Sequence, residues 1–132
     1  MLARSALTEA VLHDRLVAKG YQPETATRTV ARCRELGYVS DERLARERAR
    51  SLRARGAGSL KIVADLTARG VPDRLVGAAV LASQEGESEL EWARRALTQA
   101  GLSAGSGSRA WRFLLSRGFD ADVATEALDH RA

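Results

Sequence analysis

One short phrase occurs three times along this chain of 132 residues, and it constrains the fold more than any other feature. Its copies are LVAKGY at 16–21, LTARGV at 66–71 and LLSRGF at 114–119. In each copy a leucine lies four residues before the glycine, a Lys or Arg directly before it and an apolar residue directly after it. Because the glycines lie 50 and 48 residues apart, the spacing predicts a tandem structural repeat.

Composition and local pattern predict that the repeated unit is helical. Ala, Leu, Arg and Glu dominate the sequence and only two prolines occur, which favours helices over strands. Each phrase has the character of a helix end, since glycine accepts the positive φ found there and a preceding cation complements the negative end of the helix dipole. Apolar residues recur six and ten positions after each glycine: Ala26 and Val30, Val76 and Val80, Ala124 and Leu128.

Capping signals and helical spacing together place the helices. Thr8 is expected to cap a helix over about 9–19, Pro23 to begin the next, and Ser40 or Asp41 to cap a helix over about 41–55. The remaining helices are expected at the end of a leading segment (2–7), over about 60–69, from Pro72, from Ser88 to Gly101, and over about 108–117 and 121–131.

The predicted fold class is therefore all-α, built from three tandem three-helix repeats. The repeats are assigned to residues 1–39, 40–86 and 87–132 of one continuous domain, and the first is short at its N-terminus because only about six residues precede Thr8. Each unit has too small a core to be stable alone. We therefore expect the units to stack into an elongated curved solenoid.

The aromatic residues are interpreted as structural. Tyr21 and Phe119, like Val71 in the second phrase, directly follow a glycine and are expected to anchor the corner between consecutive helices. Trp92 and Trp111 lie among apolar residues at helical spacing, which favours packing in the core over stacking on nucleic-acid bases.

The chain contains no catalytic or metal-binding motif that we recognise. His13 and His130 have no companion residues of the HExxH or CxxC kind, and neither GxxxxGK[ST] nor GxGxxG occurs. We therefore expect a protein that is not an enzyme and that binds no cofactor and no metal.

The cysteine content and the lengths of the apolar runs indicate in which cellular compartment the protein is expected. The lone Cys33 cannot form an internal disulfide, which favours a reducing compartment. No apolar run approaches the roughly 18 residues of a membrane span, and the first residues lack the apolar segment of a signal peptide. We expect a soluble cytoplasmic protein with no membrane contact.

Positive charge is concentrated in one segment. The whole chain carries a net charge of +4, but residues 43–61 hold seven basic residues and one acid, whereas residues 71–91 hold one Arg and five acids. A local excess of this size favours an acidic partner, either nucleic acid or an acidic protein surface.

Most of this charge lies on the helix expected over 41–55. Its inward face is expected to carry Leu44, Ala45, Ala49 and Leu52. A different face, within roughly 80° on a helical wheel, carries Arg43, Arg46, Arg50 and Arg53. Like charges at these spacings weaken a helix by a few tenths of a kcal/mol per pair, so such a stripe often has a use, although a solvated face is the simpler interpretation. Arg48 is expected to point toward the apolar side, with its stem packed and its head in water.

Residues 37–51, GYVSDERLARERARS, together with the three repeated phrases, resemble the RecX family of recombination regulators. The matching residues of the family's turn, acidic helix start and aromatic–Ala pair are Gly37, Tyr38, Val39, Asp41 and Ala45. The departures are Ser40 where an acid is usual, Leu44 where Phe is usual and Arg48 at a position that is commonly aromatic. The resemblance extends from about Leu2 to Leu128.

The resemblance implies a regulatory, non-enzymatic protein of three-helix repeats that binds the RecA recombinase, particularly its filament on single-stranded DNA. It implies inhibition of the ATPase, strand-exchange and coprotease activities of RecA. Our hypothesis is that a set of basic residues makes this contact: Arg43, Arg46, Arg50 and Arg53, with Lys61 and Arg69 beside them.

Three points stay open at the level of sequence. The stripe is also compatible with a protein that binds nucleic acid directly, or with a helical scaffold whose arginines are only solvated. Contact with single-stranded DNA is left undecided. Solenoid units usually need no second chain, so a monomer is expected.

Overall fold

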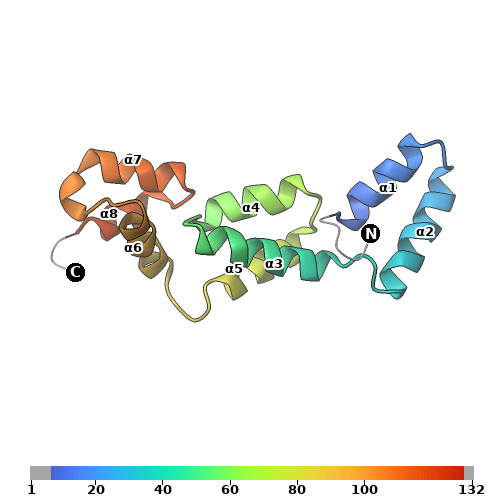
Figure 1. The fold of residues 1–132 in the computed structure, drawn as a ribbon, viewed down its shortest axis with the longest axis horizontal. Helices are drawn as coiled ribbons and strands as arrows, with labels where there is room; N and C mark the ends of the chain where they lie inside the picture. Colours follow the sequence, from blue (N-terminus) through green and yellow to red (C-terminus); the bar gives the residue numbers. More distant parts are fainter. Residues whose placement is uncertain (1–6, 130–132) are drawn as a thin grey trace.

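The computed structural model describes residues 7–129, which are all-helical and contain no strand (Figure 1). The helices are α1 (Glu9–Ala18), α2 (Pro23–Glu35), α3 (Asp41–Ala54), α4 (Ser59–Ala68), α5 (Asp73–Ser83), α6 (Glu89–Gln99), α7 (Ser108–Ser116) and α8 (Ala121–Ala127), with a 3-10 turn η2 (Ala104–Ser106) before α7. These elements confirm the predicted all-α fold. The leading helix expected at 2–7 lies outside the described residues, apart from Leu7.

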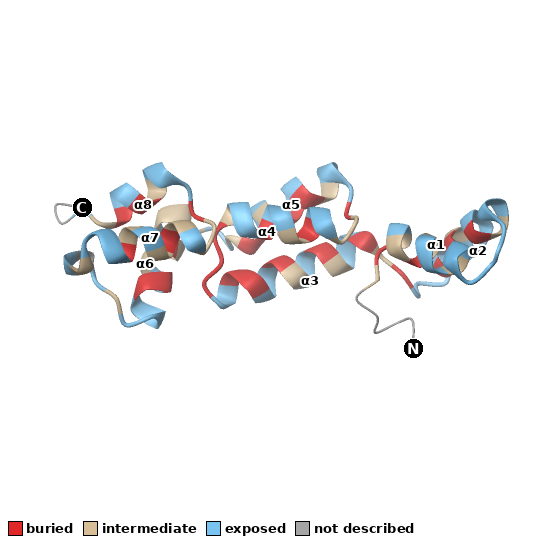
Figure 2. Ribbon diagram, turned by 90° about the horizontal axis from the view of Figure 1, so that it is seen from above, coloured by how far each residue is buried: buried red, intermediate tan, exposed pale blue. Residues whose placement is uncertain are grey.

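The helices form three groups along an elongated row (Figure 1). α1 packs on α2, α3 packs on α4 and α5, and α6 and α7 pack on α8. Each group has a separate cluster of buried apolar side chains, and Figure 2 shows the helices buried on the sides that face their own group and exposed on the outside. The molecule is therefore a row of small repeats, each with its own core. The repeat limits 1–39, 40–86 and 87–132 stay a prediction.

Helix starts are fixed by short polar side chains, as expected. The Thr8 hydroxyl accepts a hydrogen bond from the Val11 amide at 3.2 Å, and the Ser88 hydroxyl accepts one from the Glu91 amide at 3.1 Å. Of the two candidates before α3, the structure selects Ser40, whose hydroxyl accepts from the Arg43 amide.

The repeated phrase forms the same helix end three times, at the end of α1, α4 and α7. We call each phrase a corner (16–21, 66–71 and 114–119). The glycines have φ of 106°, 90° and 95°, and the amide after each glycine donates to the carbonyl of the leucine five residues earlier at 3.1 to 3.2 Å. This is the Schellman arrangement, in which the residues at its two ends also pack together when both are apolar. It explains why the leucine and the apolar residue are part of the phrase.

Two of the corners also dock onto the neighbouring repeat, and we call these contacts the joints. At the first joint the Thr8 hydroxyl, at the start of α1, donates to the Arg69 carbonyl at 2.6 Å. At the second joint the Gly58 and Leu60 amides, at the start of α4, donate to the carbonyls of Arg117 and Gly118 at 2.7 and 2.9 Å. The end of α4 thus meets the start of α1, and the end of α7 meets the start of α4, along one side of the molecule (Figure 1).

The corner of the first repeat faces no neighbouring repeat within the described structure. Val71 and Phe119 are buried at the joints, but Tyr21 is 54% exposed. Tyr21, which was expected to anchor its corner like its two counterparts, is therefore mostly exposed and differs from them. Val71 packs in the core of the second repeat and Phe119 in the core of the third, whereas Tyr21 is not part of the core cluster of the first repeat.

We predict that Gly118→Ala destabilises the fold much more than Gly20→Ala. Both glycines have positive φ, which costs an alanine about 1–2 kcal/mol. A Cβ at Gly118 would in addition lie 2.5 Å from the Lys61 amide nitrogen, whereas a Cβ at Gly20 would meet nothing within 4 Å. Overpacking of this kind adds about 1–3 kcal/mol. The free energies of unfolding of the two variants, measured in urea, check the difference, and equal losses would contradict the docking of this corner.

Candidate partner-binding surface

The exposed basic surface follows α3. Its inward face carries Ala45, Ala49 and Leu52, which are buried in the core of the second repeat. Arg43, Arg46 and Arg50, spaced three and four residues apart, lie on another face, where they are exposed. Three of the four arginines predicted for the stripe are therefore available to a partner.

Arg46 and Arg50 come together around one surface hollow. The hollow has a volume of 230 Å³ and is completed by Ala82, Ser83 and Glu85 from the end of α5. Arg50 Nη2 lies 3.9 Å from Glu85 Oε2, at the outer limit of an ion pair, and both side chains are largely exposed. We call this the Arg46–Arg50 hollow.

Arg43 belongs to a second, larger hollow where α2, α3 and α5 approach one another. Its guanidinium donates to the Gly37 carbonyl at 3.3 Å. The charged side chains that line this hollow are Arg34, Arg43, Arg74, Glu9, Asp41 and Glu42. Since three acids accompany three arginines, this hollow has no net charge to attract an anion.

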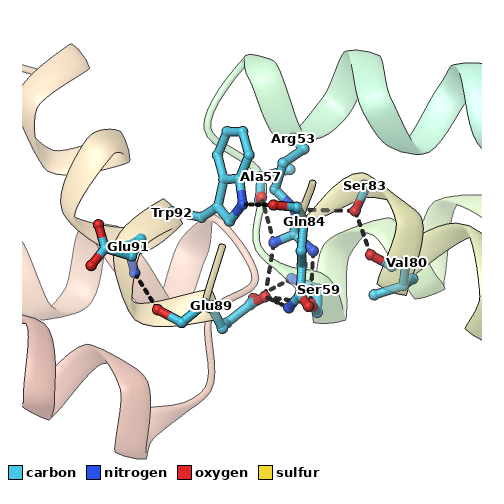
Figure 3. Close-up of polar contacts among 10 residues, drawn as sticks. Arg53, Ala57, Ser59, Val80, Ser83, Gln84, Glu89, Glu91 and Trp92 are labelled. Carbon is cyan, nitrogen blue, oxygen red and sulfur yellow. Dashed lines mark hydrogen bonds and ion pairs between the residues drawn. The ribbon is translucent and has the colours of Figure 1, made fainter. Parts of the chain in front are cut away.

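The fourth arginine of the predicted stripe, Arg53, is not part of the surface. Its side chain is only 1% exposed and lies in a polar network at the second joint (Figure 3). Its guanidinium donates to Ser83 Oγ at 3.2 Å, to Ser59 Oγ at 2.9 Å and to Glu89 Oε1 at 3.0 Å. The prediction that Arg53 contacts a partner is wrong, because the end of α3 is covered by α5 and by the start of α6.

Glu89 is the centre of this network. One oxygen accepts from the Ser59 amide at 2.7 Å, and the other accepts from Arg53, from Ser59 Oγ at 2.6 Å and from Gln84 Nε2 at 2.9 Å (Figure 3). Burial alone would raise the pKa of Glu89, but these hydrogen bonds and the charge of Arg53 outweigh it and lower the pKa below its ordinary value. Glu89 is therefore ionised in the folded protein at neutral pH.

The first joint repeats part of this arrangement. Asp41 lies 48 residues before Glu89, and like Glu89 it is the first residue of its helix. Asp41 Oδ1 accepts from the Glu9 amide at 2.9 Å, as Glu89 accepts from the Ser59 amide. Burial is the main cause that raises the pKa of Asp41, and the nearby Glu9 charge adds to it.

The two other predicted contact residues lie at the two ends of α4. Lys61 is exposed in its first turn, with its Cβ against Gly118, and Arg69 caps its end and pairs with Asp65 at 2.9 Å. Neither residue lines the Arg46–Arg50 hollow or the second hollow. The structure thus brings together Arg46 and Arg50, and it leaves Lys61 and Arg69 apart from them.

Arg48 remains partly exposed and makes a contact that the sequence did not predict. Its guanidinium makes two hydrogen bonds to the Asp65 carboxylate, at 3.1 and 3.0 Å, and so joins α3 to α4. The hydrogen bond from Arg48 is the largest cause that lowers the pKa of Asp65.

Both tryptophans are structural, as predicted. They pack against the core of the third repeat, and their indole N–H groups donate to the Gln84 carbonyl (Trp92, 2.9 Å) and to Thr125 Oγ1 (Trp111, 3.2 Å). Trp92 also lies beneath the guanidinium groups of Arg53 and Arg95.

The part of the chain that the structure describes contains no grouping of His, Cys, Asp or Glu suited to hold a metal ion. His13 lies 3.2 Å from Thr27 Oγ1 and 3.3 Å from the Pro23 carbonyl, where it links α1 to α2. None of the helices in residues 7–129 has the length and hydrophobicity needed to cross a membrane.

Sequence reasoning missed Glu89 and Glu85. From the sequence, Glu89 is only a favourable charge at a helix start, although its alignment with Asp41 at the repeat spacing is a signal that both have the same task. Glu85 carries no comparable signal, because its position beside Arg50 results from the way α5 packs against α3.

Taken together, these features define an elongated protein of helical repeats, with a basic surface on its middle repeat. Comparisons with known proteins agree. Residues 40–80 match the family model described as RecX, second three-helix domain. The chain is 34% identical over 137 aligned residues to the regulatory protein RecX of Chromohalobacter salexigens, covering 98% of this chain and 87% of the relative. It is 37% identical to the regulatory protein RecX of a Thermus thermophilus strain, covering 96% and 84%. The chain belongs to the RecX family.

The fold agrees with a solved member of the family. The crystal structure of RecX from Lactobacillus salivarius superposes with a TM-score of 0.78 at 16% identity, covering 96% of this chain and 86% of the other. At this level of identity the likeness concerns the fold alone.

We predict that Glu89→Gln lowers the free energy of unfolding by about 3–5 kcal/mol at pH 7, because it leaves the buried Arg53 without its counter-charge. The pKa of Glu89 is lowered on folding, so its contribution is present above the unfolded pKa and is lost as the pH falls through the folded pKa. The difference between wild type and variant should therefore shrink below about pH 4.

Urea unfolding of both proteins at pH 7 and in acid measures this difference. Glu126→Gln is the matched control, because it removes one carboxylate from an exposed position on α8. A constant difference across the pH range would show that Glu89 does not act through its charge.

Proposed function

We propose that this protein binds the RecA recombinase, in particular its filament on single-stranded DNA, and inhibits its ATPase, strand-exchange and coprotease activities. It acts as a monomer in the cytoplasm and without catalysis of its own. Membership of a family whose members are named regulatory proteins supports this proposal. The observation that carries it is the exposed arginine stripe on α3.

The stripe is not required by the repeat architecture. Residues 48 positions further on occupy the equivalent places on α6, where Arg43 and Arg50 are replaced by Glu91 and Thr98, whereas Arg46 is matched by Arg94. The buried apolar residues of α3, Ala45, Ala49 and Leu52, in contrast correspond to Ala93, Leu97 and Ala100 and keep their apolar character. The positive charges at positions 43 and 50 thus differ between the two repeats, whereas the apolar core positions are kept. We attribute this difference to the binding of a partner, because the fold itself does not need these charges.

The scaffold holds the stripe in a defined place. Arg46 and Arg50 lie on a helix that packs along both α4 and α5, so a partner meets them with little ordering of the backbone. Preorganised groups of this kind bind more tightly than groups on a flexible chain, because less conformational entropy is lost on binding.

We predict that the double substitution Arg46→Glu and Arg50→Glu weakens inhibition of the RecA ATPase at least about tenfold, since two attractive charges become repulsive. The measurement is ATP hydrolysis by RecA on single-stranded DNA across a titration of the protein. Arg53 is not substituted in this variant, because its loss would disrupt the contacts of the second joint and would not test binding.

The control carries Arg109→Glu and Arg112→Glu, which make the same change in charge at exposed positions of α7. This variant should inhibit like wild type. If the α3 variant inhibits as well as the control while both remain helical by circular dichroism, the stripe is not the contact surface.

The same variants test direct binding of DNA, the alternative raised by the sequence. Phosphate contacts would make log affinity for single-stranded DNA fall by roughly 0.7 per contact for each decade of salt. If wild type binds the DNA alone as tightly as it binds the RecA filament, with such a slope, DNA and not RecA is the target.

A further inference from the structure

We propose that the Arg46–Arg50 hollow receives an acidic side chain from a protein segment, that Leu81 beside it contacts an apolar residue of the same segment, and that Glu85 competes for the arginines from within the chain. This inference rests on the function proposed above and adds the chemistry of the partner to it.

The two arginines are poorly satisfied by their own protein. They lie one helical turn apart, so their like charges repel. Within the described structure Arg46 has no ion pair, and Arg50 has only Glu85 at 3.9 Å. A carboxylate placed between them would accept hydrogen bonds from both guanidinium groups, which are planar and suited to paired contacts with carboxylates.

Glu85 is held at the rim of the hollow by its backbone. It follows the end of α5 with φ of 51°, the left-handed conformation that closes a helix, and Gly86 continues the turn with φ of 81°. Its carboxylate lies 3.9 Å from Arg50 Nη2 and does not form a close pair with it. An ion pair that is exposed and long is weak. A partner carboxylate at hydrogen-bonding distance would replace it.

The neighbouring surface of α5 is apolar. Leu81 is 71% exposed, more than the other large apolar side chains exposed in the described part of the chain. Leu81 does not itself line the hollow, but it lies one helical turn before Glu85 and directly before Ala82, which both do. Gly77 and Ala78 are also exposed on α5 and are small, so a partner side chain can approach the helix closely beside Leu81.

This combination fits a protein segment better than a nucleic acid. A nucleic-acid backbone is bound by cations that remain uncompensated. Here Glu85 offsets one of the two arginines, and the adjoining hollow around Arg43 contains as many acids as arginines. Contact with a phosphate would give the exposed Leu81 no favourable binding free energy. Burial of Leu81 against an apolar side chain would. The expected partner is a segment with an acidic and an apolar residue close together.

Two single substitutions test the inference, with affinity measured for the RecA filament on single-stranded DNA and for the same DNA alone. Glu85→Gln removes the competitor and should tighten binding to the filament about two- to fivefold, as expected for an exposed ion pair. Leu81→Ser should weaken it about tenfold, because a leucine would no longer be buried. Neither change should alter the melting temperature by more than a few degrees, since both side chains are exposed. Glu126→Gln on α8, which makes the same change in charge as Glu85→Gln, should bind like wild type.

Each outcome is decisive. If wild type binds the filament and either Glu85→Gln or Leu81→Ser leaves that affinity unchanged, this inference is overturned. The proposed function then remains intact. An equal gain for Glu85→Gln and Glu126→Gln also overturns it, because net charge would then be the cause. If Glu85→Gln tightens binding to DNA alone as much as to the filament, the hollow is a phosphate site and the inference fails. Failure of wild type to bind the filament overturns the proposed function and the inference together.

Discussion

Both joints between repeats depend on backbone groups that a helix cannot satisfy by itself. The first amides of a helix and its last carbonyls have no partner within it. Here the two carbonyls that follow α7 accept from amides at the start of α4, and the carbonyl that follows α4 accepts from the hydroxyl that caps α1. Such an approach of two backbones needs positions without side chains, and Gly58 and Gly118 provide them: a Cβ at Gly58 would lie 2.5 Å from the Gly118 carbonyl.

The joints are consequently polar, in contrast to the apolar core of each repeat. At each joint a carboxylate at the start of the next repeat's first helix accepts from an amide of the previous repeat. The second joint adds Arg53, whose guanidinium lies over the Trp92 ring and donates to Glu89. A buried arginine of this kind contributes little net stability while it is paired, but it penalises any arrangement of the repeats that leaves it unpaired. The relative position of the second and third repeats is therefore set by hydrogen bonds more than by apolar contact.

Much of the fold could be predicted from the sequence because helix ends are local. The glycine, the leucine four residues before it and the caps Thr8 and Ser88 act within one or two turns, and all of them are visible in the order of residues. The errors concern contacts between helices. Arg53 shares a helical face with Arg46 and Arg50 on a wheel, but the packing of α5 and of the start of α6 over the end of α3 decides that it is buried. Tyr21 has the same local pattern as Phe119, but Phe119 is buried in the core of the third repeat and Tyr21 is exposed.

For the candidate surface, too, local features could be predicted from the sequence and contacts between elements could not. The arginine stripe follows from helical periodicity and was found, whereas the acid that faces it was not. Glu85 lies 35 residues from Arg50 in the chain, and no pattern in the sequence relates the two. A local pattern can therefore predict which side chains share one helix face, but not what the neighbouring helix places opposite them.

The stacking of α7, α4 and α1 gives the whole rod a direction. The three helices run in the same sense, so at each joint the negative end of one helix dipole meets the positive end of the next, and the two partial charges offset each other. What remains is a partial positive charge at the start of α7 and a partial negative charge at the end of α1, at opposite ends of the row (Figure 1). The stacked helices thus give the row a direction in addition to the charges of its side chains. A partner whose own two ends differ would therefore bind the two opposite orientations of this row of helices with different affinities.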